Sequence, residues 1–382
     1  MSFETARKLV DSVLDDAELT NGYINSHHSI GVILEFIGGE PLMAIGLIDQ
    51  VTDYFISELV RRRHPWATRY MISICSNGVL YFESKVQEYL KKNLGHLSFS
   101  ISIDGNKQLH DSCRVFPDGS GSYDMAMKGV KHFTEVLGGH MGSKMTIAPQ
   151  NVCYVKDAVV SLVDNGYTHI NLNCVYEDVW SAGDASELYR QLKVLADYIV
   201  DNDLEDKLFL SIFKGTGAYK RTEENNWCGG DGHMLAMDWK GDLFPCLRYM
   251  ESSLGDEREP YIIGNINTGI GCGEKEKCRL DCLCHLTVSS QSDKKCLDCP
   301  ISAGCGWCTA YNYQTFGTVD HRAMFICQMH QARVMATAYY KNRIYCKHGD
   351  ARRYEMRIPR EWALLIVPAD EYEMLLREAE TN

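Results

Sequence analysis

Cysteine is the residue type with the clearest chemical potential in this sequence, which contains 16 cysteines in 382 residues. Four of them form a tight run with the spacing C-x2-C-x5-C-x2-C, and Cys327 follows that run. The four are Cys296, Cys299, Cys305 and Cys308. Zinc ribbons separate their two cysteine pairs by about 12–20 residues so that both pairs can wrap one ion. The shorter gap here favours an iron–sulfur cluster, with zinc as the alternative.

Two further groups of cysteines precede this run. Cys228 and Cys246 bracket a segment typical of a hairpin, in which Gly241 permits a tight turn. A second stretch, beside His285, contains Cys272, Cys278, Cys282 and Cys284. These four could bind a cluster, form a separate metal site with His285, or be free thiols.

The whole series resembles the seven-cysteine motif of SPASM domains in radical S-adenosylmethionine (SAM) enzymes. It departs from that motif at Gly306 and Trp307, where three residues are usual before the last cysteine of the run. The resemblance implies two auxiliary [4Fe–4S] clusters. Cluster I would be held by Cys228, Cys246 and Cys308, and cluster II by Cys296, Cys299, Cys305 and Cys327. Cluster I would then either take a fourth ligand from Cys272, Cys278, Cys282 or Cys284, or keep a site open for substrate.

Strands and helices that could position these groups alternate over the first 215 residues, which predicts a parallel sheet. The expected strands are Ile30–Phe36, Arg69–Cys75, Leu97–Ile103, Lys144–Gln150, Thr168–Cys174 and Leu208–Phe213. The expected helices are Phe3–Asp16, Ala44–Arg62, Phe82–Asn93, Tyr123–Leu137, Val155–Asp164 and Ala185–Asp201. Parallel strands joined by helices place chemistry at the carboxyl ends of the strands.

Polar turns follow the first three expected strands. Gly38-Gly39-Glu40-Pro41 follows the first, Ser76-Asn77-Gly78 the second, and Ser102-Ile103-Asp104-Gly105 the third, with His110-Asp111 and Arg114 beyond it. In this order the turns resemble the SAM-binding signatures of radical SAM enzymes. The resemblance covers about Phe3 to Tyr345 and implies a partial (β/α)6 TIM-like barrel that lacks its first strand. The SAM-binding residues that it implies are Gly38, Gly39, Glu40, Pro41, Asn77, Ser102, Asp104 and Arg114.

The composition of the sequence changes after residue 215, where glycine, cysteine and turn residues dominate. We therefore predict three parts: a truncated barrel over 1–215, a SPASM domain over 216–345 that ends in a helix at about Ala323–Tyr345, and a C-terminal tail over 346–382. The second part has little apolar sequence, so bound clusters are expected to stabilise it.

Composition narrows the function classes. The formal net charge of −12 argues against broad nucleic-acid binding, which requires a basic surface. The sequence shows no run of about 18 apolar residues and no secretory signal, so we expect no membrane span and a cytoplasmic location.

A radical SAM enzyme needs a CxxxCxxC loop, and this sequence contains none. The nearest approach, from Cys278 through Cys282 to Cys284, ends with a one-residue gap. In the family, that loop precedes a helix like the one expected at Phe3–Asp16. The expectation is that Met1 is an internal methionine or a true truncation point, and that the chain as printed is inactive.

The resemblance implies a peptide maturase that uses a 5′-deoxyadenosyl radical, with thioether crosslinking of a cysteine-rich ribosomal precursor peptide as the favoured reaction. Its cofactors would be [4Fe–4S] clusters and SAM, and its electron donor a reductant such as flavodoxin or ferredoxin. A sulfatase-maturing enzyme is the alternative within this class. Those enzymes carry an aspartate directly after the second SPASM cysteine, where Leu247 stands, and leucine cannot act as a base. A non-catalytic iron–sulfur or zinc protein that binds a peptide is the alternative from another class.

Overall fold

A computed structural model describes residues 1–15, 23, 30–214, 220, 228–230, 232–349 and 357–380. The chain forms two compact units. Unit 1 comprises Met1–Phe99, Glu224–Ser292 and Trp307–Arg322, and unit 2 comprises Ser100–Glu223, Asp293–Gly306 and Ala323–Asn382. The predicted boundary near residue 215 lies outside the described residues and stays a prediction, as do the three predicted parts.

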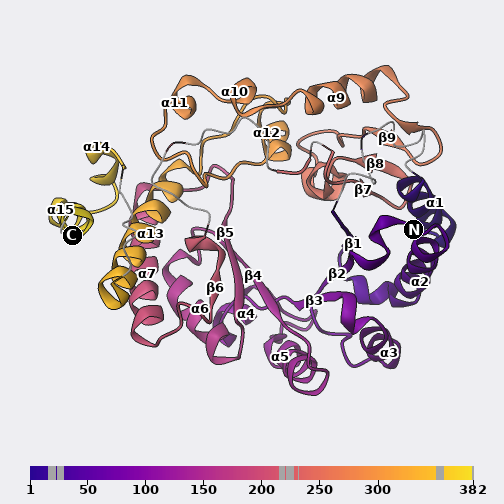
Figure 1. The fold of residues 1–382 in the computed structure, drawn as a ribbon, viewed down its shortest axis with the longest axis horizontal. Helices are drawn as coiled ribbons and strands as arrows, with labels where there is room; N and C mark the ends of the chain where they lie inside the picture. The colour runs from indigo at the N-terminus through magenta and orange to yellow at the C-terminus, as the bar shows by residue number, and fades with distance from the viewer. Residues whose placement is uncertain are drawn as a thin grey trace. The chain divides into compact units, whose positions relative to one another are not determined.

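Helices and strands alternate in the first segment of unit 1 (Figure 1). The order is α1 (Phe3–Leu14), β1 (Val32–Phe36), α2 (Ile45–Arg61), β2 (Tyr70–Ser76), α3 (Ser84–Asn93) and β3 (Leu97–Ile101). The strand order in the sheet is β1-β2-β3. β1 and β2 are parallel, in a register that runs from Val32 opposite Tyr70 to Phe36 opposite Ile74. The turns after these two strands therefore emerge at one edge of the sheet.

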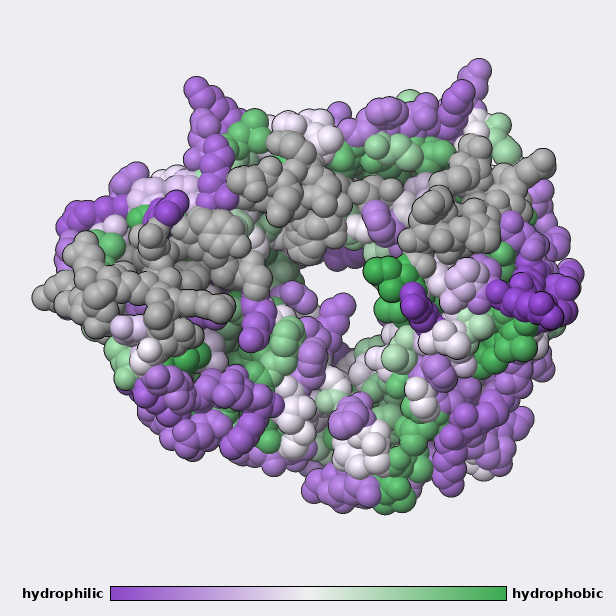
Figure 2. Space-filling view, viewed as in Figure 1, coloured by the Kyte–Doolittle hydropathy of each residue, from purple (hydrophilic) through white to green (hydrophobic). Residues whose placement is uncertain are grey.

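An apolar core holds α1 against α2. Ala6, Val10 and Leu14 of α1 pack with Val51 and other buried residues of α2 and of the turn that follows it. The i, i+3, i+4 spacing of these side chains gives each helix one apolar face. Figure 2 shows the hydrophilic side chains that cover the outer face of α1.

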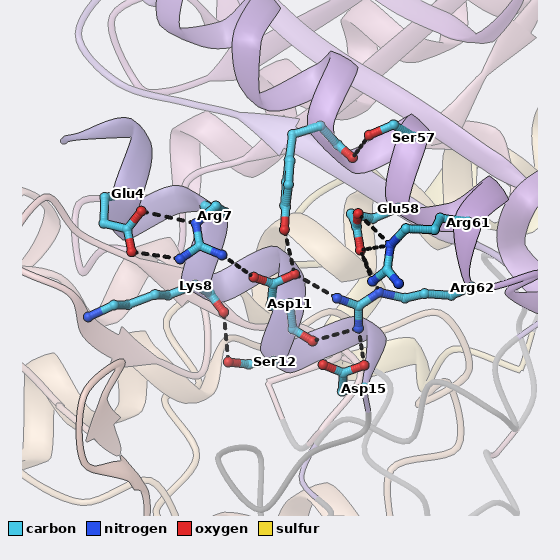
Figure 3. A network of polar contacts seen from close by, with 11 residues as sticks. Glu4, Arg7, Lys8, Asp11, Ser12, Asp15, Ser57, Glu58, Arg61 and Arg62 are labelled. Carbon is cyan, nitrogen blue, oxygen red and sulfur yellow. Dashed lines mark hydrogen bonds and ion pairs between the residues drawn. The ribbon is translucent and has the colours of Figure 1, made fainter.

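An ion-pair network lies at the edge of this core, between α1 and the end of α2 (Figure 3). Arg62, directly after α2, donates to Asp11 of α1 at 2.6 Å and to Glu58 at 2.9 Å, and also pairs with Asp15. The Arg61 guanidinium lowers the pKa of the Glu58 carboxyl to about 2, with Arg62 adding to the effect against burial. The network therefore joins α1 to α2 mainly through Arg62, Asp11 and Glu58, whose side chains are largely shielded from solvent.

The later segments of unit 1 build a small antiparallel sheet in the order β10-β9-β8-β7. Its strands are β7 (Ala236–Met237), β8 (Asp242–Phe244), β9 (Gly264–Asn265) and β10 (Gly269–Ile270). Short helices accompany it: α8 (Glu251–Leu254), α9 (Glu274–Cys284), α10 (Val288–Gln291) and α12 (Thr309–Phe316). Tyr249, Tyr261, Phe244 and Leu283 are among the buried residues of its core.

Unit 2 contains a second three-stranded sheet, in the order β4-β5-β6. Its strands are parallel: β4 (Gly142–Ile147), β5 (His169–Cys174) and β6 (Phe209–Leu210). Its helices are α4 (Lys107–Cys113), α5 (Tyr123–Lys131), α6 (Val155–Asp164), α7 (Ala182–Asp201), α11 (Lys294–Leu297), α13 (Cys327–His348), α14 (Arg360–Ala363) and α15 (Ala369–Glu380).

The longest helices of unit 2, α7 and α13, lie side by side (Figure 1). Tyr339 of α13 donates to Asp197 of α7 at 2.6 Å, and Arg343 pairs with Asp201 at 2.7 Å. Among the helices that the structure describes, none is long and apolar enough to cross a membrane.

The structure confirms all six expected strands and all seven expected helices, with shifted ends. The expected strand at Leu208–Phe213 is reduced to Phe209–Leu210, because a 3-10 turn at Ser211–Phe213 follows at once. The expected helix at Tyr123–Leu137 changes at His132 into a π-helical turn, His132–Val136. The helices that the sequence prediction missed include α4, α9, α12 and α15.

Candidate functional site

The three cysteines predicted to hold cluster I lie close to one another in unit 1. Cys228 begins a short described stretch, Cys246 follows β8, and Cys308 directly precedes α12. Burial, with a smaller contribution from electrostatic repulsion by the nearby Cys308 and Cys228, raises the pKa of the Cys246 thiol to about 12. The three thiols are partly buried. A thiolate at such a place needs a compensating positive partner, which a metal centre provides.

Backbone N–H groups lie near two of these sulfurs. Those of Arg248 and Tyr249 act to lower the pKa of the Cys246 thiol, and those of Tyr311 and Ala310 act to lower the pKa of the Cys308 thiol. Burial raises the pKa of the Cys308 thiol, whereas these backbone donors and the nearby Arg248 act in the opposite direction. The second pair of N–H groups belongs to the first turn of α12, where backbone donors have no helical partner. The local backbone therefore favours negatively charged sulfur.

A single metal ion would require its ligands to meet at one point. Within the described ranges, no group of three or more His, Cys, Asp or Glu residues is arranged in that way. The thiolates of a cubane cluster each bind a different iron, so they surround a larger volume. As soft sulfur donors, the thiols of Cys228, Cys246 and Cys308 suit an iron–sulfur cluster.

The four cysteines predicted for cluster II all belong to unit 2. Cys296 is in α11, and its sulfur lies 3.3 Å from the Met324 sulfur. The Met324 carbonyl accepts from the backbone N–H of Cys327, the first residue of α13. The His330 Nε2 lies 2.6 Å from the Ile301 carbonyl oxygen, which ties α13 to the loop between Cys299 and Cys305. Each predicted ligand set thus falls within one compact unit.

The remaining cysteines of the predicted SPASM region lie around α9. Cys278 and Cys282, one helical turn apart, interact with each other, and both are exposed. Cys272 donates to the Thr268 carbonyl, and Cys284 is exposed. The His285 Nδ1 lies 2.8 Å from the Asp281 carbonyl oxygen. Within this stretch, Cys278 and Cys282 are the two thiols that the structure describes as interacting with each other.

Glu40 connects two of the predicted SAM-binding turns in unit 1. Its carboxylate accepts from the Ser76 hydroxyl and the Asn77 backbone N–H, each at 2.8 Å, and from the Leu42 N–H at 3.0 Å. Pro41 begins a short 3-10 helix directly after it. A Cβ atom built on Gly38 or Gly39 would meet nothing within 4 Å, so the space beside both glycines is open. A ligand can approach the backbone there.

The other predicted SAM-binding residues belong to unit 2. Arg114 donates from Nε and Nη2 to the Asp104 carboxylate. The Asp104 N–H donates to His110 Nδ1 at 3.4 Å, and His110 Nε2 lies 3.1 Å from the Ser122 hydroxyl oxygen. Burial lowers the pKa of His110, which favours the neutral ring. Ser102 is half-buried on the turn after β3.

Sequence reasoning missed two polar residues near the cluster I cysteines, Thr309 and Tyr249. The Thr309 hydroxyl oxygen lies 3.4 Å from the Cys228 sulfur, and Tyr249 donates to Thr309 at 2.9 Å. Neither residue belongs to a recognisable spacing pattern. The only available signal was that both stand near a predicted ligand in the sequence.

Comparison with known proteins gives matches by structure alone. No protein-family model and no curated protein matches the chain. The solved structure of hexahistidine-tagged anSMEcpe with bound AdoMet matches with a TM-score of 0.63 at 15% identity, over 97% of this chain and 90% of that one. Native anSMEcpe with bound AdoMet and the Kp18Cys peptide matches with a TM-score of 0.62 at 15% identity, over 92% and 91%. The chain has their fold.

A second neighbour is SuiB of Streptococcus suis bound to its precursor peptide SuiA, with a TM-score of 0.54 at 15% identity over 86% of this chain and 69% of that one. These matches confirm the expected α/β class, with a partial TIM-like barrel and a C-terminal cysteine-rich domain. At this level of identity the likeness establishes fold and leaves the activity to be argued from the residues.

Proposed function

We propose that this protein is a radical SAM peptide maturase whose SPASM-type region holds two auxiliary [4Fe–4S] clusters. The observation that carries the proposal is the gathering of Cys228, Cys246 and Cys308 in unit 1, with backbone N–H groups near two of the sulfurs. These cysteines come from three separate segments of the chain. Iron–sulfur clusters are held by such converging thiolates.

The structural neighbours support the substrate class. anSMEcpe, an anaerobic sulfatase-maturating enzyme, has structures with bound AdoMet and peptide, and SuiB has structures with S-adenosylmethionine and with a precursor peptide. By analogy, this protein would bind SAM, and the residues that the sequence resemblance implies for this role are Gly38, Gly39, Glu40, Pro41, Asn77, Ser102, Asp104 and Arg114. Its second substrate would be a peptide.

The chain's own residues would position these groups. Glu40 holds the turns after β1 and β2 in a fixed relation, and Arg114 is held by Asp104. Cys228, Cys246 and Cys308 would hold cluster I, and Cys296, Cys299, Cys305 and Cys327 would hold cluster II. When bound, the clusters supply and accept single electrons, and SAM supplies the 5′-deoxyadenosyl radical.

Within this class we propose thioether crosslinking of a cysteine-containing peptide. Leu247, which begins the turn after Cys246, offers no base where sulfatase-maturing enzymes carry an aspartate. In thioether formation the peptide loses one hydrogen atom from carbon, and its thiol loses a proton and an electron as the sulfur–carbon bond forms. SAM would supply the acceptor of the hydrogen atom, solvent would take the proton, and the clusters would supply the acceptor of the electron. The product is therefore lighter by two hydrogens.

The printed sequence has no CxxxCxxC, so SAM cleavage requires a segment that supplies these cysteines. The test uses the reconstituted chain with and without such a segment, with SAM, dithionite and a cysteine-containing peptide. We expect 5′-deoxyadenosine and a crosslinked peptide only when the segment is present, as detected by mass spectrometry. Cleavage by the printed chain would refute the requirement for the segment. Failure of the extended chain would favour a non-catalytic iron–sulfur protein.

A further inference from the structure

A chain of two hydroxyl groups leads to the sulfur of Cys228. The Tyr249 hydroxyl donates to the Thr309 hydroxyl oxygen at 2.9 Å, and that oxygen lies 3.4 Å from the Cys228 sulfur. All three residues belong to unit 1. Tyr249 is fully buried, and Thr309 is 1% exposed. Burial removes water as a competing partner, so each hydroxyl depends on its neighbours.

The direction of both hydrogen bonds follows from the chemistry of the sulfur. A hydroxyl has one proton to donate. A cysteine sulfur bound to iron has lost its proton and can only accept, so the Thr309 hydroxyl must donate to it. The Thr309 oxygen is then available to accept from Tyr249, which is the direction that the structure shows. The three groups therefore form one ordered chain, from Tyr249 through Thr309 to Cys228.

Packing holds the side chains of Tyr249 and Thr309 in place. The Tyr249 ring lies 4.9 Å from the Tyr261 ring and 6.3 Å from the Tyr313 ring, between centroids. Tyr313 and Thr309 both belong to α12, which begins directly after Cys308. Because Thr309 is the first residue of this helix, its position is coupled to that of a second predicted ligand. The hydroxyls are thus held in place before any cluster binds.

We infer that Tyr249 and Thr309 are positioning residues that raise the reduction potential of cluster I through a hydrogen bond to the Cys228 sulfur. This inference rests on the proposed function in one respect, that Cys228 binds iron. Reduction adds negative charge to a cluster, and a donor at a ligand sulfur stabilises that charge. Hydrogen bonds to the sulfurs are among the factors that set cluster potentials.

Thr309 donates from a side-chain hydroxyl, whereas the other donors at this site are backbone N–H groups. Cys246 and Cys308 have backbone N–H groups nearby, and only a substitution by proline would remove these. Thr309→Val replaces the hydroxyl by a methyl group of similar shape, and Thr309→Ser keeps the hydroxyl while it removes the methyl group. Tyr249→Phe removes only the outer hydroxyl. These variants separate hydrogen bonding from packing.

The experiment is a reductive titration of the reconstituted full chain, followed by electron paramagnetic resonance. The signal that disappears in Cys246→Ala identifies cluster I. In Thr309→Val we expect its midpoint to move to more negative potential by up to about 59 mV, a tenfold change for a one-electron couple. Thr309→Ser should keep the parent midpoint, and Tyr249→Phe should give a smaller shift in the same direction.

The outcomes distinguish this inference from the proposed function. If the parent chain binds no iron and sulfide, the proposed function fails. If the cluster forms but Thr309→Val keeps the midpoint potential of the parent, the inferred role of the hydrogen bonds from Tyr249 through Thr309 to Cys228 is refuted, and the proposed function stands. A shift of the midpoint potential in Thr309→Ser equal to that in Thr309→Val would also refute the role of the hydrogen bond, because loss of packing would then explain both shifts. If Thr309→Val binds no cluster, the midpoint potential of Tyr249→Phe is the deciding measurement. A midpoint equal to that of the parent refutes the inferred hydrogen bonds from Tyr249 through Thr309 to Cys228.

Discussion

The Glu40 carboxylate accepts from the Ser76 hydroxyl at 2.8 Å, which joins the turn after β1 to the turn after β2. The second carboxylate oxygen accepts from the Asn77 backbone N–H, also at 2.8 Å. Because β1 and β2 are parallel neighbours, their carboxyl ends reach the same edge of the sheet. One acidic side chain therefore fixes two of the turns that are proposed to bind SAM.

Replacement of Glu40 by glutamine should destabilise this edge. The amide keeps one accepting oxygen, but its NH2 group cannot accept from the Asn77 N–H or the Ser76 hydroxyl. We expect the free energy of unfolding to fall by about 1–3 kcal/mol, as measured by urea denaturation. Glu35→Gln is the matched control, because Glu35 is exposed and accepts only from Ser73, at 3.2 Å, among the bonds described here. Equal losses in the two variants would contradict the role of Glu40.

The network between α1 and α2 makes a second prediction. The Arg62 side chain is 14% exposed and contacts Asp11 and Glu58, whereas the neighbouring Arg61 side chain is 66% exposed. Arg62→Leu should lower the free energy of unfolding by about 1–3 kcal/mol, because it leaves shielded carboxylates with fewer partners. Arg61→Leu should cost less than Arg62→Leu, because ion pairs of exposed side chains contribute little. Urea unfolding of both variants tests this order, and a reversed order would refute the account of the network.

His110 should make stability depend on pH. Burial lowers its pKa in the folded chain below the ordinary value of 6.5, so the unfolded chain takes up a proton first as the pH falls. The contribution of the neutral ring is complete above pH 6.5 and is lost as the pH drops towards the lower folded pKa. His110→Gln should therefore flatten the decline in the urea midpoint below pH 6.5. His140→Gln, at an exposed position, should keep the parent slope. A parent slope in His110→Gln would show that other groups cause the decline.

Much of the fold follows from short-range patterns in the sequence. The apolar spacing of Ile48, Val51 and Phe55 predicts α2, and these residues are buried as that spacing requires. The helix α9 was missed because its sequence, EKEKCRLDCLC, is polar on most sides and its cysteine spacing suggested a metal loop. The strand β6 was overestimated because an apolar run cannot show that a 3-10 turn begins at Ser211.

The candidate site likewise has residues that the sequence predicts and a residue that it cannot predict. A resemblance to a cysteine motif selected Cys228, Cys246 and Cys308, and the folded chain brings the three together. The Thr309 hydroxyl could not be found in this way, because its contact with Cys228 depends on how α12 packs against distant segments. Long-range contacts of single polar atoms leave no periodic trace in a sequence.

The two predicted ligand sets should respond separately to mutation. Cys296→Ala with Cys299→Ala should remove one cluster, about four irons, and should unfold the segment Asp293–Gly306 of unit 2, since ligation contributes folding free energy to a small core. The barrel helices should survive, and circular dichroism would report the partial loss. Unchanged iron content and circular dichroism would refute the assignment of cluster II.

The most direct test of the central claim is the content of iron and acid-labile sulfide per chain after anaerobic reconstitution. Two [4Fe–4S] clusters predict about eight irons and about eight sulfides. Cys75, Cys113 and Cys153, which are exposed and belong to neither predicted ligand set, can be replaced by serine as a control, with no expected change in either count. Stoichiometric zinc without acid-labile sulfide would contradict the account.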